Sequence, residues 1–433
     1  MTAPTAQHPE VEADPPAGGH AALRRLIPSR ESLPTLLVLG AAFLPLALAP
    51  IRARFLGPEG RGEFAFFQAA VMVITAAAGG GIRHAYYGQS LKGGLRSQLW
   101  TRRLWTPAIV LATIAAIPLA LAGFVSVDPV VGAGVIVIAL GAPLFALVQL
   151  EMADAQYQQR QFRVAGLTSV PACLEFVANI ALILLRSLTL TTAVVVTVTS
   201  ELARGVCAIV YSRRDLARGE RPTKDPAASR SLARRAIHFL PATLVPLVAA
   251  NVDAIVYGAM GHTAVLGVYS VAKLVPTFLL LAASVSEGRF IARAGRDGIA
   301  RTSVAFLLPL LGLGALATAA GSVLVEPLFG APFAGARPAF VVTALVGVGG
   351  ALYVWLVAIC ARRGLSRVSM WSSVLVLAVG ASGSVLVGLS PDLDPLIMGT
   401  PVLAGYAIGV VSILFQLRTM RVRGSGRGAR PGR

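Results

Sequence analysis

Charged side chains are scarce in this sequence. Asp, Glu, Lys and Arg make up 13% of the 433 residues, against about 25% in soluble domains. Hydrophobic residues make up 55%, and the mean hydropathy is +0.73. This balance excludes a soluble globular enzyme and a disordered or fibrous chain. Since about 20 apolar residues cross a bilayer once as a helix, the composition predicts an all-α integral membrane protein with roughly a dozen crossings.

Cysteine and histidine are also rare, at three and five residues. Cys173, Cys207 and Cys360 lie in apolar runs without a CxxC motif, which argues against a disulfide framework and a zinc site. The sequence contains no Walker, HExxH or GxSxG motif. We therefore expect no catalytic residue, no metal and no cofactor, and hence a protein that is not an enzyme. The net charge is +18, but the basic residues of the segment 212–235 have no aromatic residues among them, so nucleic acid is not an expected partner.

Apolar runs between charge clusters predict twelve membrane spans. They lie at 33–51, 63–82, 104–125, 130–151, 164–185, 191–211, 236–258, 265–287, 302–325, 338–360, 368–390 and 395–417. Cytoplasmic loops collect Lys and Arg. With both termini in the cytoplasm, 31 of the 38 basic residues fall on that side and 5 on the other. The bias predicts a multi-pass protein of the bacterial cytoplasmic membrane with both termini inside.

A long basic segment at 212–235 divides the spans into two groups of six. We expect a disordered cytoplasmic tail at 1–32, a six-helix lobe at 33–211, a cytoplasmic linker at 212–235, a second lobe at 236–417 and a basic tail at 418–433. The basic linker is suited to anionic lipid headgroups, or it is simply a topology signal. Two such lobes around a central cavity are a common transporter plan, with sites near the bilayer midplane.

The two predicted lobes share a short motif. Residues 57–64, between the first two spans, and residues 261–269, between the seventh and eighth, each form a short turn ending in Gly-x-aromatic. Pro45 and Pro50 in the first span have the same spacing as Pro241 and Pro246 in the seventh. Glycine and proline permit tight turns. The repetition indicates a duplicated six-helix unit.

These segments resemble a known family. The run from Arg54 to Phe64 (RFLGPEGRGEF), with Gly79-Gly80-Gly81-Ile82 after the next span, is similar to the opening of polysaccharide-transporter flippases of the O-antigen type. The segments 251–258 (NVDAIVYG) and 266–272 (LGVYSVA) resemble the seventh-to-eighth helix hairpin of that family. The family belongs to the multidrug/oligosaccharidyl-lipid/polysaccharide exporter superfamily. The resemblance implies a flippase for a polyprenyl-diphosphate-linked glycan, with membrane lipids and glycan-assembly proteins as further partners.

Charges inside the predicted spans are the candidate functional residues, because an intramembrane charge costs about 2.5–3.5 kcal/mol or more. Glu175 has no partner nearby in sequence, so it is expected to face the cavity or to take up a proton. Glu201 and Arg204 share one helix face, where they neutralise each other or meet substrate. Asp253 and Lys273 lie at similar depth on consecutive spans, as a coupling or structural pair.

Three arginines at the predicted span ends complete the candidate site. Arg83 closes the second span, and Arg52 and Arg54 stand at the outer mouth of the first. A guanidinium fork suits a diphosphate, although an interfacial, snorkelling role is the alternative for each.

The leading interpretation is a flippase driven by an ion gradient or the membrane potential. A drug or metabolite cation-coupled antiporter on the same fold is the alternative, and it favours an acidic, aromatic-lined pocket; aromatics are 7% of this chain. A membrane-embedded glycan-assembly enzyme is disfavoured because the longest predicted outer loop, 326–337, holds one carboxylate. A role as a non-transporting scaffold is a further alternative.

Overall fold

The protein is represented by a computed structural model. The structure describes residues 33–79, 81–82, 102–157, 160–217, 226–283, 299–362, 365–390 and 392–425. Arg83, the predicted N-terminal tail and the middle of the predicted linker lie outside these residues.

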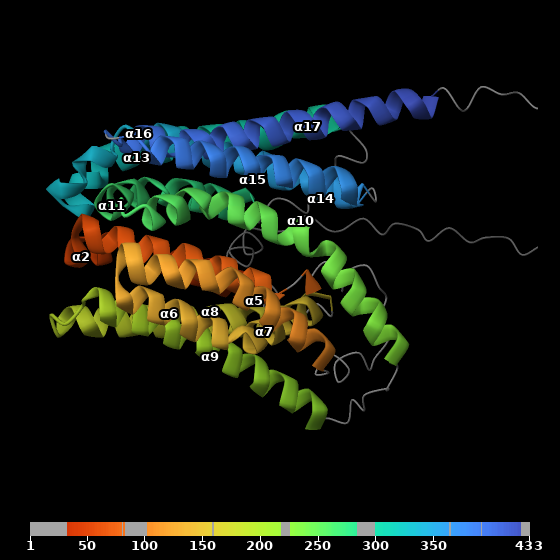
Figure 1. Cartoon of the computed structure of the whole chain (residues 1–433), viewed down its shortest axis with the longest axis horizontal. Coiled ribbons are helices and arrows are strands. Elements are labelled where there is room, and N and C mark those ends of the chain that lie inside the picture. The colour runs from red at the N-terminus through yellow and green to blue at the C-terminus, as the bar shows by residue number, and fades with distance from the viewer. Residues whose placement is uncertain are drawn as a thin grey trace, which may run out of the picture.

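Within them the chain is helical throughout (Figure 1). The helices are α2 (Leu33–Gly79), α5 (Arg102–Ala122), the π-helix η1 (Gly123–Val127), α6 (Pro129–Leu140), α7 (Ala142–Tyr157), α8 (Gln161–Leu184), α9 (Leu190–Ala217), α10 (Pro226–Ala259), α11 (Thr263–Ala272), α13 (Ile299–Phe329), the 3₁₀ turn η2 (Ala331–Ala336), α14 (Ala339–Arg362), α15 (Ser366–Gly388), α16 (Pro395–Met398) and α17 (Thr400–Ser425).

The membrane-protein prediction is confirmed. In the described part of the chain, nine helices are long and apolar enough to cross a membrane, or ten when the bent pair α6 and α7, at 57°, is taken as one crossing. Within the described residues, each of the twelve predicted segments is mostly helical. The number differs because α2 contains the first two segments, two helical stretches joined at a kink at Gly57 that together count as one candidate, and because the apolar part of α10, Leu244–Ala259, is short.

Gly57 forms the kink between the first two predicted segments. It interrupts α2 with φ 68° and ψ −179°, a backbone conformation that glycine adopts readily and other residues rarely do. Pro58 follows and has no N–H for the helix ladder. The predicted turn is therefore present, but it is one residue wide. The predicted linker is also narrower than expected, because α9 continues to Ala217 and α10 begins at Pro226.

Two groups of helices lie side by side (Figure 1). The first lobe consists of α2 and α5–α9, and the second of α10, α11 and α13–α17. Between them α2 packs against α10 and α11. The turns at Gly57 and Gly261 and the η2 turn lie close together, because α2, α11 and η2 contact one another beside them; this end of the molecule is called the Gly57 end. The start of α2 and the end of α17 lie at the opposite end.

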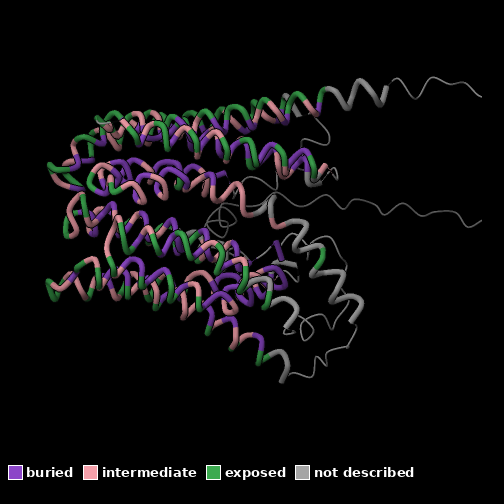
Figure 2. The backbone as a smooth tube through the Cα atoms, viewed as in Figure 1, coloured by how far each residue is buried: buried purple, intermediate pink, exposed green. Residues whose placement is uncertain are grey.

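Burial follows this arrangement (Figure 2). In the most apolar stretch of α2, and in that of α14, 67% of the residues are buried. In the corresponding stretches of α8 and α13 the buried share is 17%. Helices with large exposed apolar faces, such as α5 with Ile114, Ile117 and Leu121, have the composition that a lipid environment requires. The inner helices α2, α10 and α11 therefore carry the contacts between the lobes.

Candidate functional site

Arg52 is the centre of a buried polar cluster in the first lobe. Its Nη2 donates to Glu175 Oε1 at 2.6 Å and its Nε to Asn179 Oδ1 at 3.0 Å. Thr197 donates its hydroxyl to the same carboxylate oxygen at 3.2 Å. Arg52 is 1% exposed, and its guanidinium lies 5.0 Å from the centroid of the Phe64 ring. The buried ion pair joins α2 to α8, and the hydrogen bond from Thr197 joins α9 to the same carboxylate.

One prediction about this cluster was wrong. Glu175 is not an unpaired carboxylate, because Arg52 neutralises it. Arg52 lies within α2, before the kink at Gly57, and its side chain faces α8. The partners are 123 residues apart, so the depth of Glu175 in its span was predictable while the facing helix was not.

Arg54 is exposed and lies three residues before Gly57. Its Nε donates to the Leu328 carbonyl at 2.8 Å, and its Nη2 donates to the Pro327 carbonyl. These carbonyls stand at the end of α13, which belongs to the second lobe. A cation at a helix C-terminus is favourable. Arg54 therefore links the two lobes at the Gly57 end.

Glu201 and Arg204 form the expected i,i+3 pair on α9, with Arg204 Nη1 donating to Glu201 Oε2 at 2.9 Å. The Arg204 side chain is 34% exposed, and its Nε is buried with no hydrogen-bond partner among the described residues. A guanidinium carries five N–H donors. Arg204 therefore has donors left over after its pairing with Glu201.

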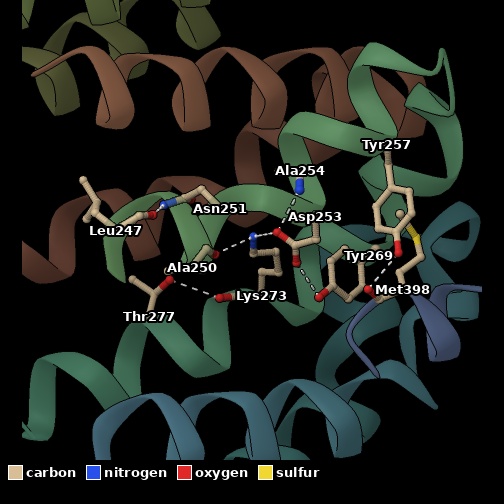
Figure 3. Close-up of polar contacts among 10 residues, drawn as sticks. All are labelled: Leu247, Ala250, Asn251, Asp253, Ala254, Tyr257, Tyr269, Lys273, Thr277 and Met398. Carbon is tan, nitrogen blue, oxygen red and sulfur yellow. Dashed lines mark hydrogen bonds and ion pairs between the residues drawn. The ribbon is translucent and has the colours of Figure 1, made fainter. Parts of the chain in front are cut away.

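Asp253 and Lys273 meet in the second lobe (Figure 3), with Lys273 Nζ 2.6 Å from Asp253 Oδ1. The other carboxylate oxygen accepts from the Tyr269 hydroxyl at 2.8 Å, and Oδ1 also accepts from the Ala254 N–H at 2.7 Å. Asp253 is 1% exposed. Because each oxygen has a donor, this pair joins α10 to the end of α11 as a satisfied network.

The sequence did not single out a second buried acidic group. Glu151 and Asp154 are buried on α7, and Arg163 on α8 lies 3.8 Å from Glu151. The Arg163 guanidinium also lies 5.7 Å from the Tyr211 ring centroid. The predicted span ended at residue 151, whereas α7 continues to Tyr157. The i,i+3 spacing of the two carboxylates was the signal that could have identified them.

The lobes are in backbone contact at the Gly57 end. A Cβ atom on Gly62 of α2 would overlap the Thr263 carbonyl oxygen, and a Cβ on Gly267 of α11 would overlap the Pro58 carbonyl oxygen. Arg61 Nε donates to Ser270 Oγ at 3.1 Å across the same contact. Residues 58–62 and 263–270 are called the seam below. The two repeated motifs of the sequence thus pack against each other, and only glycine allows this approach.

Comparison with known proteins places this architecture in a family. The profile of the family described as polysaccharide biosynthesis protein matches residues 32–285, which is more than half of the chain. The chain belongs to this family. The prediction of a polysaccharide-transporter family is confirmed, and the family is not one of enzymes. A search of curated proteins gave no relative with significant similarity.

Solved structures share the fold of this family member at low sequence identity. The lipid II flippase MurJ in an inward closed conformation has a TM-score of 0.62 and 13% identity, covering 89% of this chain and 87% of that one. An inward-facing multidrug resistance MATE transporter of the MOP superfamily gives 0.59 and 13%, covering 91% and 99%. The Vibrio cholerae MATE transporter VcmN gives 0.53 and 15%, covering 90% and 96%. The chain is therefore a multi-pass membrane protein with a MOP transporter fold.

Proposed function

We propose that the protein moves a lipid-linked oligosaccharide or polysaccharide precursor, a glycan on a polyprenyl diphosphate, from the inner to the outer leaflet by alternating access. The seam is the observation that carries this proposal. It closes the Gly57 end through two packed turns, one from each lobe. Such a contact can separate as a unit, because each lobe has its own ion pairs, at Arg52–Glu175 and at Asp253–Lys273.

The polysaccharide family and the charges favour this substrate over a cationic drug. An antiporter for cations needs a carboxylate that is available inside the membrane. The predicted carboxylates Glu175, Glu201 and Asp253 are each paired with a basic side chain. Arg204, by contrast, has donors to spare, and an arginine fork fits a diphosphate. An ion gradient or the membrane potential is the proposed driving force.

The proposed orientation places the Gly57 end outside the cell, because the segment around Gly57 lies between the first two predicted spans, while 31 of the 38 basic residues fall in the segments predicted inside. In a cysteine-free background, single cysteines should react with an impermeant thiol reagent in intact cells when placed at Glu59, Asp128, His262 or Asp392. Cysteines at Lys224 or Arg362 should react only after permeabilisation. Outside labelling at position 224, which lies beyond the described residues, would overturn the orientation and the two-lobe arrangement.

Arg204 provides a test of the proposed function. Arg204→Ala should lower export of the glycan at least about tenfold, the effect of losing a charged hydrogen bond, with unchanged protein in the membrane. Arg204→Lys should rescue export partly, because a point charge replaces a planar fork. Arg337→Ala is the matched control, since it breaks an exposed ion pair with Glu326 that contributes little. Full export by Arg204→Ala would remove this residue from the substrate path.

A further inference from the structure

Arg61 is a buried arginine that takes part in none of the ion pairs described above. It is 5% exposed and lies in the seam, where Nε donates to Ser270 Oγ. Ser270 in turn donates to the Gly267 carbonyl at 2.8 Å. The Arg61 guanidinium also lies 6.0 Å from the centroid of the Phe64 ring. Among the residues that the structure describes, no carboxylate forms an ion pair with Arg61.

The charge around Phe64 is therefore unbalanced. The guanidinium groups of Arg52 and Arg61 lie 5.0 and 6.0 Å from the centroid of this one ring. Glu175 neutralises Arg52. Arg61 has a hydroxyl and an aromatic ring, and a buried charge without a counter-ion is costly. An arginine cannot relieve this cost by losing its proton, so only hydration or an anion can do so.

The seam is closed by a close backbone contact. The missing Cβ atoms of Gly62 and Gly267 allow the backbones of α2 and α11 to meet, and this packing does not require a charge on Arg61. Burial of Arg61 opposes this closure, whereas its hydrogen bond to Ser270 offsets part of the cost. When the seam separates, the guanidinium becomes accessible with its donors available to a ligand.

We propose that Arg61 is an anion-binding residue of the open seam, which takes a phosphate group of a lipid diphosphate and thereby couples substrate binding to opening of the Gly57 end. The inference rests on the proposed function and adds a residue to it. A ligand shifts a conformational equilibrium only through different affinities for the two states. Arg61 supplies that difference, because the closed seam buries it and the open seam exposes it.

The test measures seam opening in the full chain reconstituted in nanodiscs. Cys173, Cys207 and Cys360 are replaced, and a single cysteine is placed at Thr263, which is buried in the seam. The probe is farnesyl diphosphate, with farnesol as the control for the lipid tail. We expect farnesyl diphosphate, and not farnesol, to raise the rate of thiol labelling severalfold. Labelling at Asp392→Cys, an exposed position outside the seam, should not change.

Arg61→Met separates this proposal from a purely structural role. If the charge awaits an anion, the apolar side chain favours closure: labelling without ligand should fall about tenfold, and the response to farnesyl diphosphate should disappear. If Arg61 only latches the seam through Ser270, labelling should instead rise. Arg61→Lys should keep a weaker response, and Arg337→Met, which removes an exposed ion pair with Glu326, should keep the full one. Size-exclusion profiles matching the parent protein establish that each variant is folded.

The outcomes separate this inference from the proposed function. No response of the parent protein to farnesyl diphosphate, or faster labelling in Arg61→Met, would overturn the role of Arg61 even if glycan export is normal. A response that depends on Arg61 in a protein that moves no lipid-linked glycan would support the anion site and refute the proposed substrate.

Discussion

Replacing Gly267 with alanine is expected to abolish glycan export while leaving the amount of protein in the membrane nearly unchanged. The added Cβ would overlap the Pro58 carbonyl oxygen, which belongs to the backbone and cannot rotate away. Overpacking of this kind costs about 1–3 kcal/mol, and here the cost falls on the closed seam. Since transport by alternating access requires closure in every cycle, the variant should be held open at the Gly57 end.

The measurement for Gly267→Ala is export of the glycan together with immunodetection of the protein in the membrane. Gly62→Ala should act in the same way, because its Cβ would overlap the Thr263 carbonyl oxygen from the other lobe. The matched control is Gly312→Ala, at a helical glycine of α13 whose Cβ would have no neighbour within 4 Å. Normal export by both seam variants would show that the close contact is dispensable.

The second large effect concerns the buried ion pair of the first lobe. Glu175→Met should lower the free energy of unfolding by about 3–5 kcal/mol, because it leaves the Arg52 charge buried without a counter-ion. Arg52 is 1% exposed and Glu175 is 15% exposed, so water cannot replace the lost partner for Arg52. The double variant Arg52→Met/Glu175→Met should recover most of the stability, since paired apolar residues remove both charges.

Thermal denaturation of the detergent-solubilised protein provides the measurement, followed by fluorescence-detected size exclusion. The double variant should also export the glycan, because the role of Arg52 and Glu175 is to hold α2 against α8 and α9. Glu201→Met is the comparison, because Arg204 is 34% exposed and can be hydrated when its partner is lost. A destabilisation by Glu175→Met no larger than that of Glu201→Met would contradict the account of the cluster.

The sequence predicted the spans, since apolar length and basic loops are local properties of the chain. It also indicated both pairs that lie close in sequence: Glu201 with Arg204, on one helix face, and Asp253 with Lys273, on a hairpin. The partner of Glu175 could not be predicted in this way. A hydropathy pattern gives the depth of a residue, whereas the helix that it faces depends on the packing of the whole lobe.

The contact between the lobes at the seam could not be predicted from the sequence either. The repeated Gly-x-aromatic motifs were visible at 57–64 and 261–269, and they indicated a duplicated unit. That Gly62 and Gly267 pack against each other's turns is a property of how the two lobes meet. Arg61 was therefore counted as one of five outer basic residues, whereas the structure buries it between the lobes.

The central claim is that the protein carries a lipid-linked glycan precursor across the bilayer, and reconstitution tests it most directly. The full chain is placed in liposomes containing a fluorescent polyprenyl-diphosphate-linked glycan, and a membrane-impermeant quencher reports the fraction in the outer leaflet. We expect the wild-type protein to exchange the glycolipid between leaflets and the Gly267→Ala variant to exchange no more than empty liposomes do. Equal rates in wild-type and empty liposomes, under an imposed membrane potential and ion gradient, would contradict the account.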